Sequence, residues 1–125
     1  SGRLNHMRNS IFYFATSLVL LSACSLFQTL HSTTYIKAEN AFILGNNEHG
    51  KFSADVTNTS NQEIKVWQCP ISGGQHSPMV LKSKERTKLV VEKNTALRIE
   101  NASFEEVAVK LKVKGDTGLS MGYKY

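Results

Sequence analysis

The sequence has little cysteine, and it has no long apolar run. Two cysteines among 125 residues are too few for a disulfide-rich scaffold. The apolar run from Ile11 to Leu21 covers 11 residues, whereas a membrane-spanning helix needs about 20. A chain of 125 residues has room for one small domain with short extensions, which excludes a multidomain enzyme.

Charge of one sign is also in short supply. Lys and Arg number 15 against 10 Asp and Glu, and the surplus falls to three once Arg3 and Arg8 near the start are set aside. A nucleic-acid-binding protein shows a stronger and more clustered basic bias. The composition therefore predicts no nucleic-acid partner.

The first residues have the order of a secretory signal. We expect residues 1–6 to be the remnant of an expression vector and Met7 to be the natural start. A single basic residue, Arg8, precedes the apolar run, and small residues follow it. Positive residue, short apolar stretch and small residues are the parts of a signal peptide, so we predict one over residues 7–23, with an apolar helix.

The end of this signal carries a motif. Leu21-Ser22-Ala23-Cys24 matches the lipobox, and the N-terminus therefore resembles that of bacterial lipoproteins. The resemblance implies that the Cys24 thiol is joined to a diacylglycerol, that the bond before it is cut, and that the new amino group is acylated. Ser25 stands where an Asp tends to retain enteric lipoproteins at the inner membrane, which favours the outer membrane. A protein anchored in the cell envelope by several acyl chains is expected.

The segment that follows is predicted to be a tether. Residues 24–33 then hold the lipidated cysteine and the link to the body of the protein. In a chain that keeps its signal, residues 9–30 are expected to form an apolar helix that packs against a second copy, so that the unprocessed chain self-associates. With Cys24 lipidated, Cys69 is the remaining thiol.

From residue 34 to 125 the hydrophobic pattern has a period of two, which is typical of strands with one buried face. The clearest run is residues 106–114, in which apolar Val and Leu alternate with Glu, Ala and Lys. Strands are predicted near 34–37, 41–44, 51–58, 62–68, 78–83, 87–92, 96–100, 106–114 and 119–124. Short strands with frequent turn signals predict an all-β fold, a small antiparallel β-sandwich of the immunoglobulin-like or Greek-key kind.

Two hairpins of this body look alike. Residues 52–67 and 96–113 each have an alternating strand, an Asn-x-Ser turn, an acidic residue and a second alternating strand. The pattern resembles the hairpins of immunoglobulin-like domains on bacterial surface proteins, and an ancient duplication is an alternative explanation. Asn58 and Asn101 also match the glycosylation sequon, but in a bacterial chain we expect them to form turns.

The loop after the fourth predicted strand carries a thiol, an imidazole and a thioether. Cys69, His76 and Met79, with His49 as a second imidazole, are the ligand types of a copper electron-transfer site. A looser copper or zinc site on His49, Cys69 and His76 is a further possibility. The alternative is a glycine-rich crossover loop with a buried cysteine and no cofactor.

Lysines at period two form a candidate binding surface. Lys110, Lys112 and Lys114 project from one strand face, and a second basic cluster comprises Lys82, Lys84, Arg86 and Lys88. These cations are suited to lipid phosphates or an acidic glycan. The alternative is an edge strand whose lysines prevent pairing with another sheet. Trp67 is either an exposed binding anchor or a packed side chain.

No arrangement of residues indicates catalysis. Cys69 and His76 lie near each other in sequence, but nothing signals an oxyanion hole, and adjacent Glu105 and Glu106 point to opposite faces of a strand. We therefore predict a lipid-anchored bacterial envelope protein, a non-catalytic binding or structural module with an envelope protein or glycan as partner. The alternative is a periplasm-facing copper or redox protein.

Overall fold

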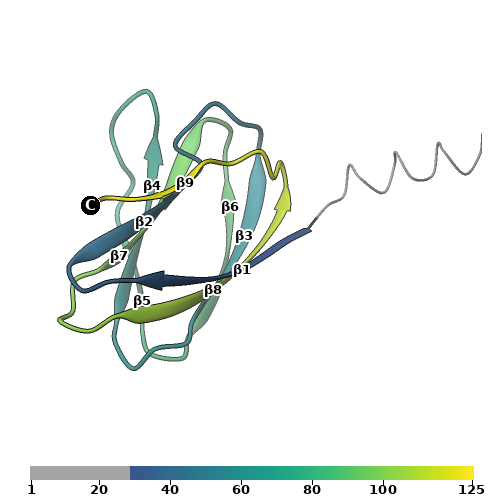
Figure 1. The fold of residues 1–125 in the computed structure, drawn as a ribbon. Helices are drawn as coiled ribbons and strands as arrows, with labels where there is room; N and C mark the ends of the chain where they lie inside the picture. Colours follow the sequence, from purple (N-terminus) through teal and green to yellow (C-terminus); the bar gives the residue numbers. More distant parts are fainter. Residues whose placement is uncertain (1–28) are drawn as a thin grey trace, which may run out of the picture.

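The computed structural model describes residues 29–125, which fold into two antiparallel sheets that pack face to face (Figure 1). The strands are β1 (Thr29–Ile36), β2 (Asn40–Leu44), β3 (Phe52–Asn58), β4 (Ile64–Pro70), β5 (Met79–Leu81), β6 (Arg86–Val91), β7 (Thr95–Asn101), β8 (Val107–Gly115) and β9 (Met121–Tyr123). Each predicted strand is present, and the predicted all-β sandwich is confirmed. Within residues 29–125, no helix has the length and apolar character that crossing a membrane requires.

The first strand begins five residues earlier than predicted. Residues 29–33, which the sequence analysis placed in the tether, belong to β1 and pair with β8 from Thr29–Lys114 onward. Most side chains at these positions are Ser or Thr, so the sequence shows no alternation of apolar and polar residues there. The residues belong to the sheet because they pair with β8. The predicted signal peptide, its helix and the lipidation site Cys24 lie outside the described residues.

The strand order is that of a jelly roll. One sheet has the order β1-β8-β3-β6 and the other β5-β4-β7-β2-β9. Strand pairs β1–β8, β2–β7, β3–β6 and β4–β5 are those of one long hairpin rolled into two sheets. A jelly roll is built from Greek keys, as predicted, whereas an immunoglobulin-like sandwich divides seven strands differently between its sheets.

The two halves of the roll repeat each other. The sheet orders β1-β8-β3-β6 and β5-β4-β7-β2 match strand for strand: β1 corresponds to β5, β8 to β4, β3 to β7 and β6 to β2. The two strands of each such pair are four strands apart along the chain, and β9 is an addition to the second sheet. The turns after β3 and β7 share their hydrogen bonds: the side-chain amides of Asn58 and Asn101 donate to the carbonyls of Gln62 (2.6 Å) and Glu105 (2.7 Å). Both asparagines are fully buried. The similarity of the two predicted hairpins is therefore structural.

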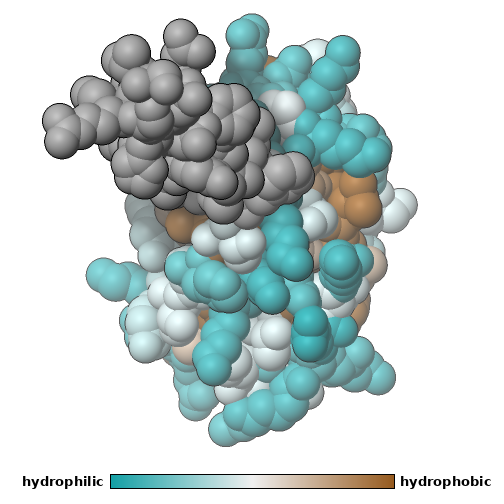
Figure 2. All heavy atoms as spheres, turned by 90° about the vertical axis from the view of Figure 1, so that its right-hand side faces the viewer, coloured by the Kyte–Doolittle hydropathy of each residue, from teal (hydrophilic) through white to brown (hydrophobic). Residues whose placement is uncertain are grey.

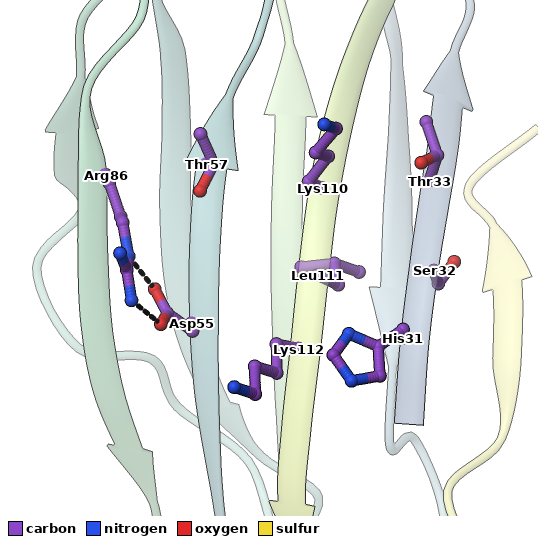
Figure 3. A pocket seen from close by; sticks show the side chains of 9 residues that line it. All are labelled: His31, Ser32, Thr33, Asp55, Thr57, Arg86, Lys110, Leu111 and Lys112. Carbon is purple, nitrogen blue, oxygen red and sulfur yellow. Dashed lines mark hydrogen bonds and ion pairs between the residues drawn. The ribbon is translucent and has the colours of Figure 1, made fainter. Parts of the chain in front are cut away.

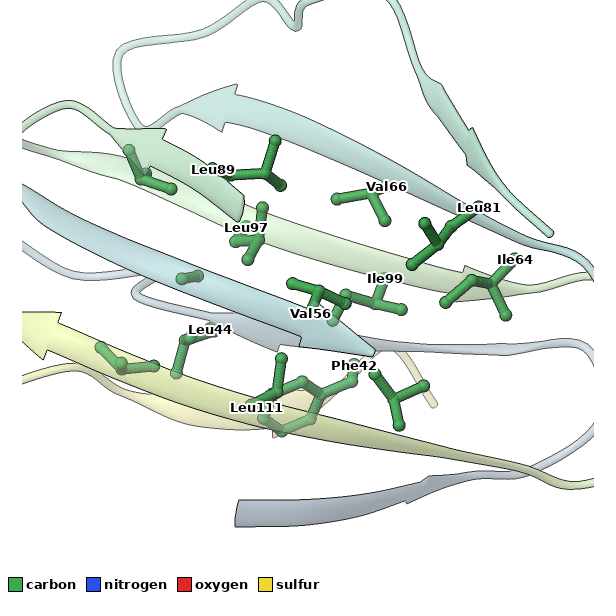
Figure 4. Close-up of a cluster of buried hydrophobic side chains, with 14 of the residues drawn as sticks. Phe42, Leu44, Val56, Ile64, Val66, Leu81, Leu89, Leu97, Ile99 and Leu111 are labelled. Atoms are coloured by element: carbon green, nitrogen blue, oxygen red, sulfur yellow. The ribbon is translucent and has the colours of Figure 1, made fainter. Parts of the chain in front are cut away.

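The core lies between the sheets. Inward side chains of both sheets form one cluster of Val, Leu, Ile and Phe, with Phe42, Val56, Leu97 and Ile99 among them (Figure 4). On β8 the inward residues are Val107, Val109, Leu111 and Val113, as the alternation predicted. Because each inward residue of a strand is followed by an outward one, this core fixes which side chains cover the outer face of each sheet.

Candidate functional site

Three lysines of β8 point away from the core. Leu111 and Val113 are buried, so the residues on either side of them, Lys110, Lys112 and Lys114, face outward and are exposed. Alternate residues of a strand lie about 7 Å apart. The three ammonium groups therefore form a row of like charge along the strand.

Further basic side chains reach this face from both sides of β8. Asp55 of β3 pairs with Lys112 on one side and with Lys88 of β6 on the other. Arg86 lies two positions before Lys88 and so points the same way. His31 of β1 pairs with Lys112 from the opposite direction. We define the basic face as His31, Arg86, Lys88, Lys110, Lys112 and Lys114.

One carboxylate lies among these cations. The guanidinium of Arg86 donates to both oxygens of Asp55, through Nε to Oδ1 at 2.7 Å and through a second nitrogen to Oδ2. This hydrogen bonding, followed by the positive charges of Arg86, Lys112 and Lys88, lowers the pKa of Asp55 and outweighs the effect of burial. The Asp55 carboxylate in turn raises the pKa of Arg86. Arg86 and Asp55 therefore largely neutralise each other.

The lysines of the face are left without such a partner. Within residues 29–125, none of the four forms an ion pair within 4.0 Å. The surface is hollowed between β1, β8, β3 and β6, with a cavity of about 430 Å³. In Figure 3, Lys112 lies between Asp55 and His31. The cavity is lined by His31, Ser32, Thr33, Asp55, Thr57, Arg86, Lys110, Leu111 and Lys112.

These side chains are suited to hold an anion. Ammonium and hydroxyl groups donate hydrogen bonds to phosphate, sulfate or carboxylate oxygens, and charge-assisted bonds are the stronger ones. A second hollow of about 150 Å³ adjoins through Asp55, Arg86 and Lys112 and extends to Lys88 and Lys114. The described surface on the side of β3, β6 and β8 is mostly hydrophilic (Figure 2). The arrangement favours several anionic groups at once over a single small anion.

The prediction that these lysines protect a sheet edge is wrong. β8 is an interior strand, paired with β1 along one side and with β3 along the other. Its backbone groups therefore need no protection from a neighbouring sheet. On β3, the residues opposite the three lysines are Thr57, Asp55 and Ser53. The row of lysines on β8 therefore needs an explanation other than edge protection.

His49 occupies a buried position that holds two loops together. Its ring nitrogens contact backbone carbonyls, Nδ1 that of Gly50 at 2.6 Å and Nε2 that of Thr95 at 2.8 Å. The ring also packs edge-on against Phe52. A metal ion at His49 would have to displace one of these carbonyls.

The other predicted metal ligands lie on β4, on the loop beyond it and at the start of β5. Cys69 is partly buried, and burial raises the pKa of its thiol, with a smaller opposing effect of Arg98. His76 and Met79 are exposed. Among residues 29–125, no three His, Cys, Asp or Glu side chains come close enough to hold a metal ion. The structure therefore does not bring His49, Cys69 and His76 together as a three-ligand centre.

Trp67 lies on the other sheet. It pairs with Arg98 of β7 on the outer side of β4, where its indole is half-buried. The indole Nε1 is buried and has no hydrogen-bond partner among the described residues. Of the predicted binding residues, the three lysines therefore lie on one sheet and Trp67 on the other.

Sequence reasoning missed four members of the site or their role in it. His31 was placed in the tether, Asp55 was not singled out, and Arg86 and Lys88 were treated as a separate cluster. The period-two spacing of Arg86 and Lys88 was an available signal, but their meeting with β8 depends on β3 lying between them. Because β3, β6 and β8 are far apart in the sequence, no local pattern predicts that they become neighbours.

No protein-family model matches the sequence, and no curated protein matches it significantly. Solved structures do resemble the fold. A structure of CapF with the inhibitor 3-isopropenyl-tropolone aligns with a TM-score of 0.52 and 12% identity over 68% of this chain and 24% of that chain. The capsular polysaccharide assembling protein CapF from Staphylococcus aureus aligns with a TM-score of 0.49 and 10% identity over 71% of this chain and 24% of that chain.

A mitogen from Yersinia pseudotuberculosis aligns with a TM-score of 0.44 and 15% identity over 71% of this chain and 86% of that one. This chain spans about a quarter of the length of the CapF chains. At such low identity, the CapF alignment with the TM-score of 0.52 concerns the fold alone.

Proposed function

We propose that this chain is a lipid-anchored, non-catalytic binding module of the bacterial cell envelope, and that it binds anionic groups with the basic face. The observation that carries the proposal is the meeting of cations from β6 and β8 on one hollowed sheet face around a single, neutralised carboxylate. The lipobox at Cys24 supplies the proposed anchor and the envelope location, with the outer membrane favoured.

The absence of a catalytic role in this proposal has its own support. The thiolate, not the thiol, is the nucleophile, and burial of Cys69 raises the pKa of its thiol. The side chains that line the larger hollow are mainly cations and hydroxyls, which bind anions without forming a covalent intermediate. A glycan with acidic groups, a phosphate polymer and a lipid surface all present such anions.

Binding to a soluble polyanion tests the proposal. The full chain, held in neutral detergent, is titrated with inorganic polyphosphate and with dextran sulfate by calorimetry. We expect Lys110→Gln, Lys112→Gln and Lys114→Gln together to weaken binding by about tenfold or more, and wild-type binding to fall with added salt. The matched control changes Lys65, Lys93 and Lys124 to Gln, which removes the same charge from exposed positions outside the basic face. Equal loss in both triple variants would mean that net charge, not the face, governs binding.

A further inference from the structure

We propose that the partner of the basic face is the anionic phospholipid surface of the membrane that holds the anchor, so that the domain lies with the β1-β8-β3-β6 sheet against the headgroups. This proposal rests on the proposed function, since it requires both the anchor and the anion-binding face. Three features of the described residues favour a membrane surface over a soluble polyanion.

The first feature is where the chain enters the domain. β1 begins at Thr29, and Thr29 pairs with Lys114 at one end of the basic face. Cys24 precedes Thr29 by five residues, which span at most about 17 Å when extended. A lipid on Cys24 therefore brings the sheet that carries the lysines, not the opposite sheet, next to the membrane. Such a short tether also gives headgroups a high effective concentration over soluble competitors.

The second feature is the layout of the charges. Lys114, Lys112 and Lys110 pair in turn with Thr29, His31 and Thr33, so they follow β1 away from the anchor. Lys88 lies two strands from β8, a separation of about 10 Å. The cations thus extend over the sheet face beyond the larger hollow, to Lys88 and Lys114. A plane of phosphate groups matches them at many points, and its potential acts within a Debye length of about 8–10 Å.

The third feature is apolar surface beside the cations. Tyr35 of β1 is 57% exposed and Val90 of β6 is 53% exposed. Both alternate with buried neighbours and so project from the same side of the sheet as the lysines. Tyrosine is enriched at membrane interfaces, where its ring meets the acyl boundary and its hydroxyl stays hydrated. A soluble polyanion offers such side chains no apolar contact.

Protection of lysines from acetylation tests this arrangement in the full, acylated chain. The protein is reconstituted in neutral phosphatidylcholine vesicles and in vesicles with about 30% phosphatidylglycerol, and acetylation by an amine reagent is followed residue by residue by mass spectrometry. At about 0.1 M salt we expect Lys88, Lys110, Lys112 and Lys114 to react about tenfold more slowly on the anionic vesicles, and at about 1 M salt to regain their rates. Lys65, Lys93 and Lys124 should react equally on both.

The variants supply a second readout. The triple change at Lys110, Lys112 and Lys114 to Gln should restore the reactivity of Lys88 on anionic vesicles, whereas the control triple at Lys65, Lys93 and Lys124 should leave Lys88 protected. Adding inorganic polyphosphate to neutral vesicles separates the two proposals. Protection by polyphosphate but not by phosphatidylglycerol would overturn the membrane orientation and keep the anion-binding function. Protection by neither, or the absence of acyl groups on Cys24 in the purified protein, would overturn the proposed function itself.

Discussion

Asp55 sets how much positive charge the basic face presents. Its two hydrogen bonds with Arg86 neutralise one positive charge of the face. Among the described residues that line the cavity, no other is acidic. A carboxylate at this position supports the sheet by cross-strand pairing with β6, while it limits the field that an anion experiences. We therefore expect Asp55 to stabilise the fold at some cost to the proposed anion binding.

Replacing Asp55 with Asn should separate these two effects. Because the folded-state pKa of Asp55 lies below its usual 3.8, the ionised group stabilises the fold above about pH 4, and this contribution is lost as pH falls through the folded-state pKa. We expect Asp55→Asn to be less stable than wild type at pH 7 and to lose less of its stability on acidification. Urea unfolding at a series of pH values measures both.

Asp116 provides the comparison for that experiment. It accepts backbone hydrogen bonds from Gly50 (2.6 Å) and Gly118 (2.9 Å), which lower the pKa of its carboxyl. Asp116→Asn should thus show the same acid behaviour, but without any change in polyphosphate binding, whereas Asp55→Asn should bind polyphosphate more tightly. Unchanged or weaker binding by Asp55→Asn would contradict the account of the basic face.

At the scale of elements, the alternation of β8 was predictable and its neighbours were not. A period of two assigns each residue to a face of its strand without knowledge of the partner strands, which is why the inward Val109 and the outward Lys112 were both predicted correctly. Pairing of β8 with β1 and β3 depends on contacts between distant parts of the chain. Single-sequence patterns carry no signal of that kind, so an interior strand was considered an edge.

Substitutions at two neighbouring residues of β8 test this alternation. Val109→Asp places an unpaired charge in the core and should destabilise the fold by more than about 4 kcal/mol, a large part of a small domain's total. Lys110→Asp, the next residue along, places the same group on the outer face and should keep the fold while weakening polyanion binding. Circular dichroism and thermal melting of both variants check the prediction. A folded Val109→Asp protein would contradict the assignment of faces.

The repeated turns after β3 and β7 are a second feature of elements. In each turn the asparagine oxygen accepts the hydroxyl of the serine two residues on, Ser60 or Ser103, at 2.6 Å. The amide of Asn101 also donates to the carbonyls of Ile36 and Lys37 at the end of β1, just as that of Asn58 donates to Leu81 and Lys82 at the end of β5. Equivalent bonds at equivalent places support duplication of a half-length unit over chance similarity.

Changing Asn101 to Asp tests the importance of this turn. The substitution keeps the shape but replaces the amide that donates to the carbonyls of Ile36, Lys37 and Glu105 with an acceptor. The bond to Ile36 is buried, so its loss places two acceptors, one of them charged, against each other away from water. We expect a loss of about 3 kcal/mol or more in urea unfolding. Asn46→Asp, the same change at an exposed position, is the control and should be nearly neutral. Equal stability of the two variants would contradict a structural role for the turn.

At the scale of the whole molecule, the sandwich was predictable and the site was only partly so. Strand count and period two together indicated two packed sheets, because apolar faces of strands must be covered. The meeting of Arg86 and Lys88 with Lys112, and the location of Trp67 on the opposite sheet, follow from the jelly-roll order. That order is set by pairing between distant strands, which local patterns do not encode.

The anchor is the prediction that concerns the molecule as a whole. Expressed with its signal in a Gram-negative host, the protein should incorporate labelled palmitate and fractionate with membranes, and Cys24→Ala should abolish both, because only the thiol can form the thioether. Cys69→Ala serves as the control and should keep both properties. Membrane fractionation of Cys24→Ala through an uncleaved apolar segment would contradict lipidation.

β1 and β8 lie side by side although most of the chain separates them. Thr29 pairs with Lys114 and Ile36 with Val107, so about 70 to 85 residues must be looped out before this ladder forms. Folds dominated by such distant pairs are slow, because the entropy of closing long loops is lost before contacts compensate. During synthesis, β1 has no partner until β8 emerges. The proposed export suits this topology, because a chain whose first strand pairs with its eighth stays unfolded until synthesis of the domain is nearly complete.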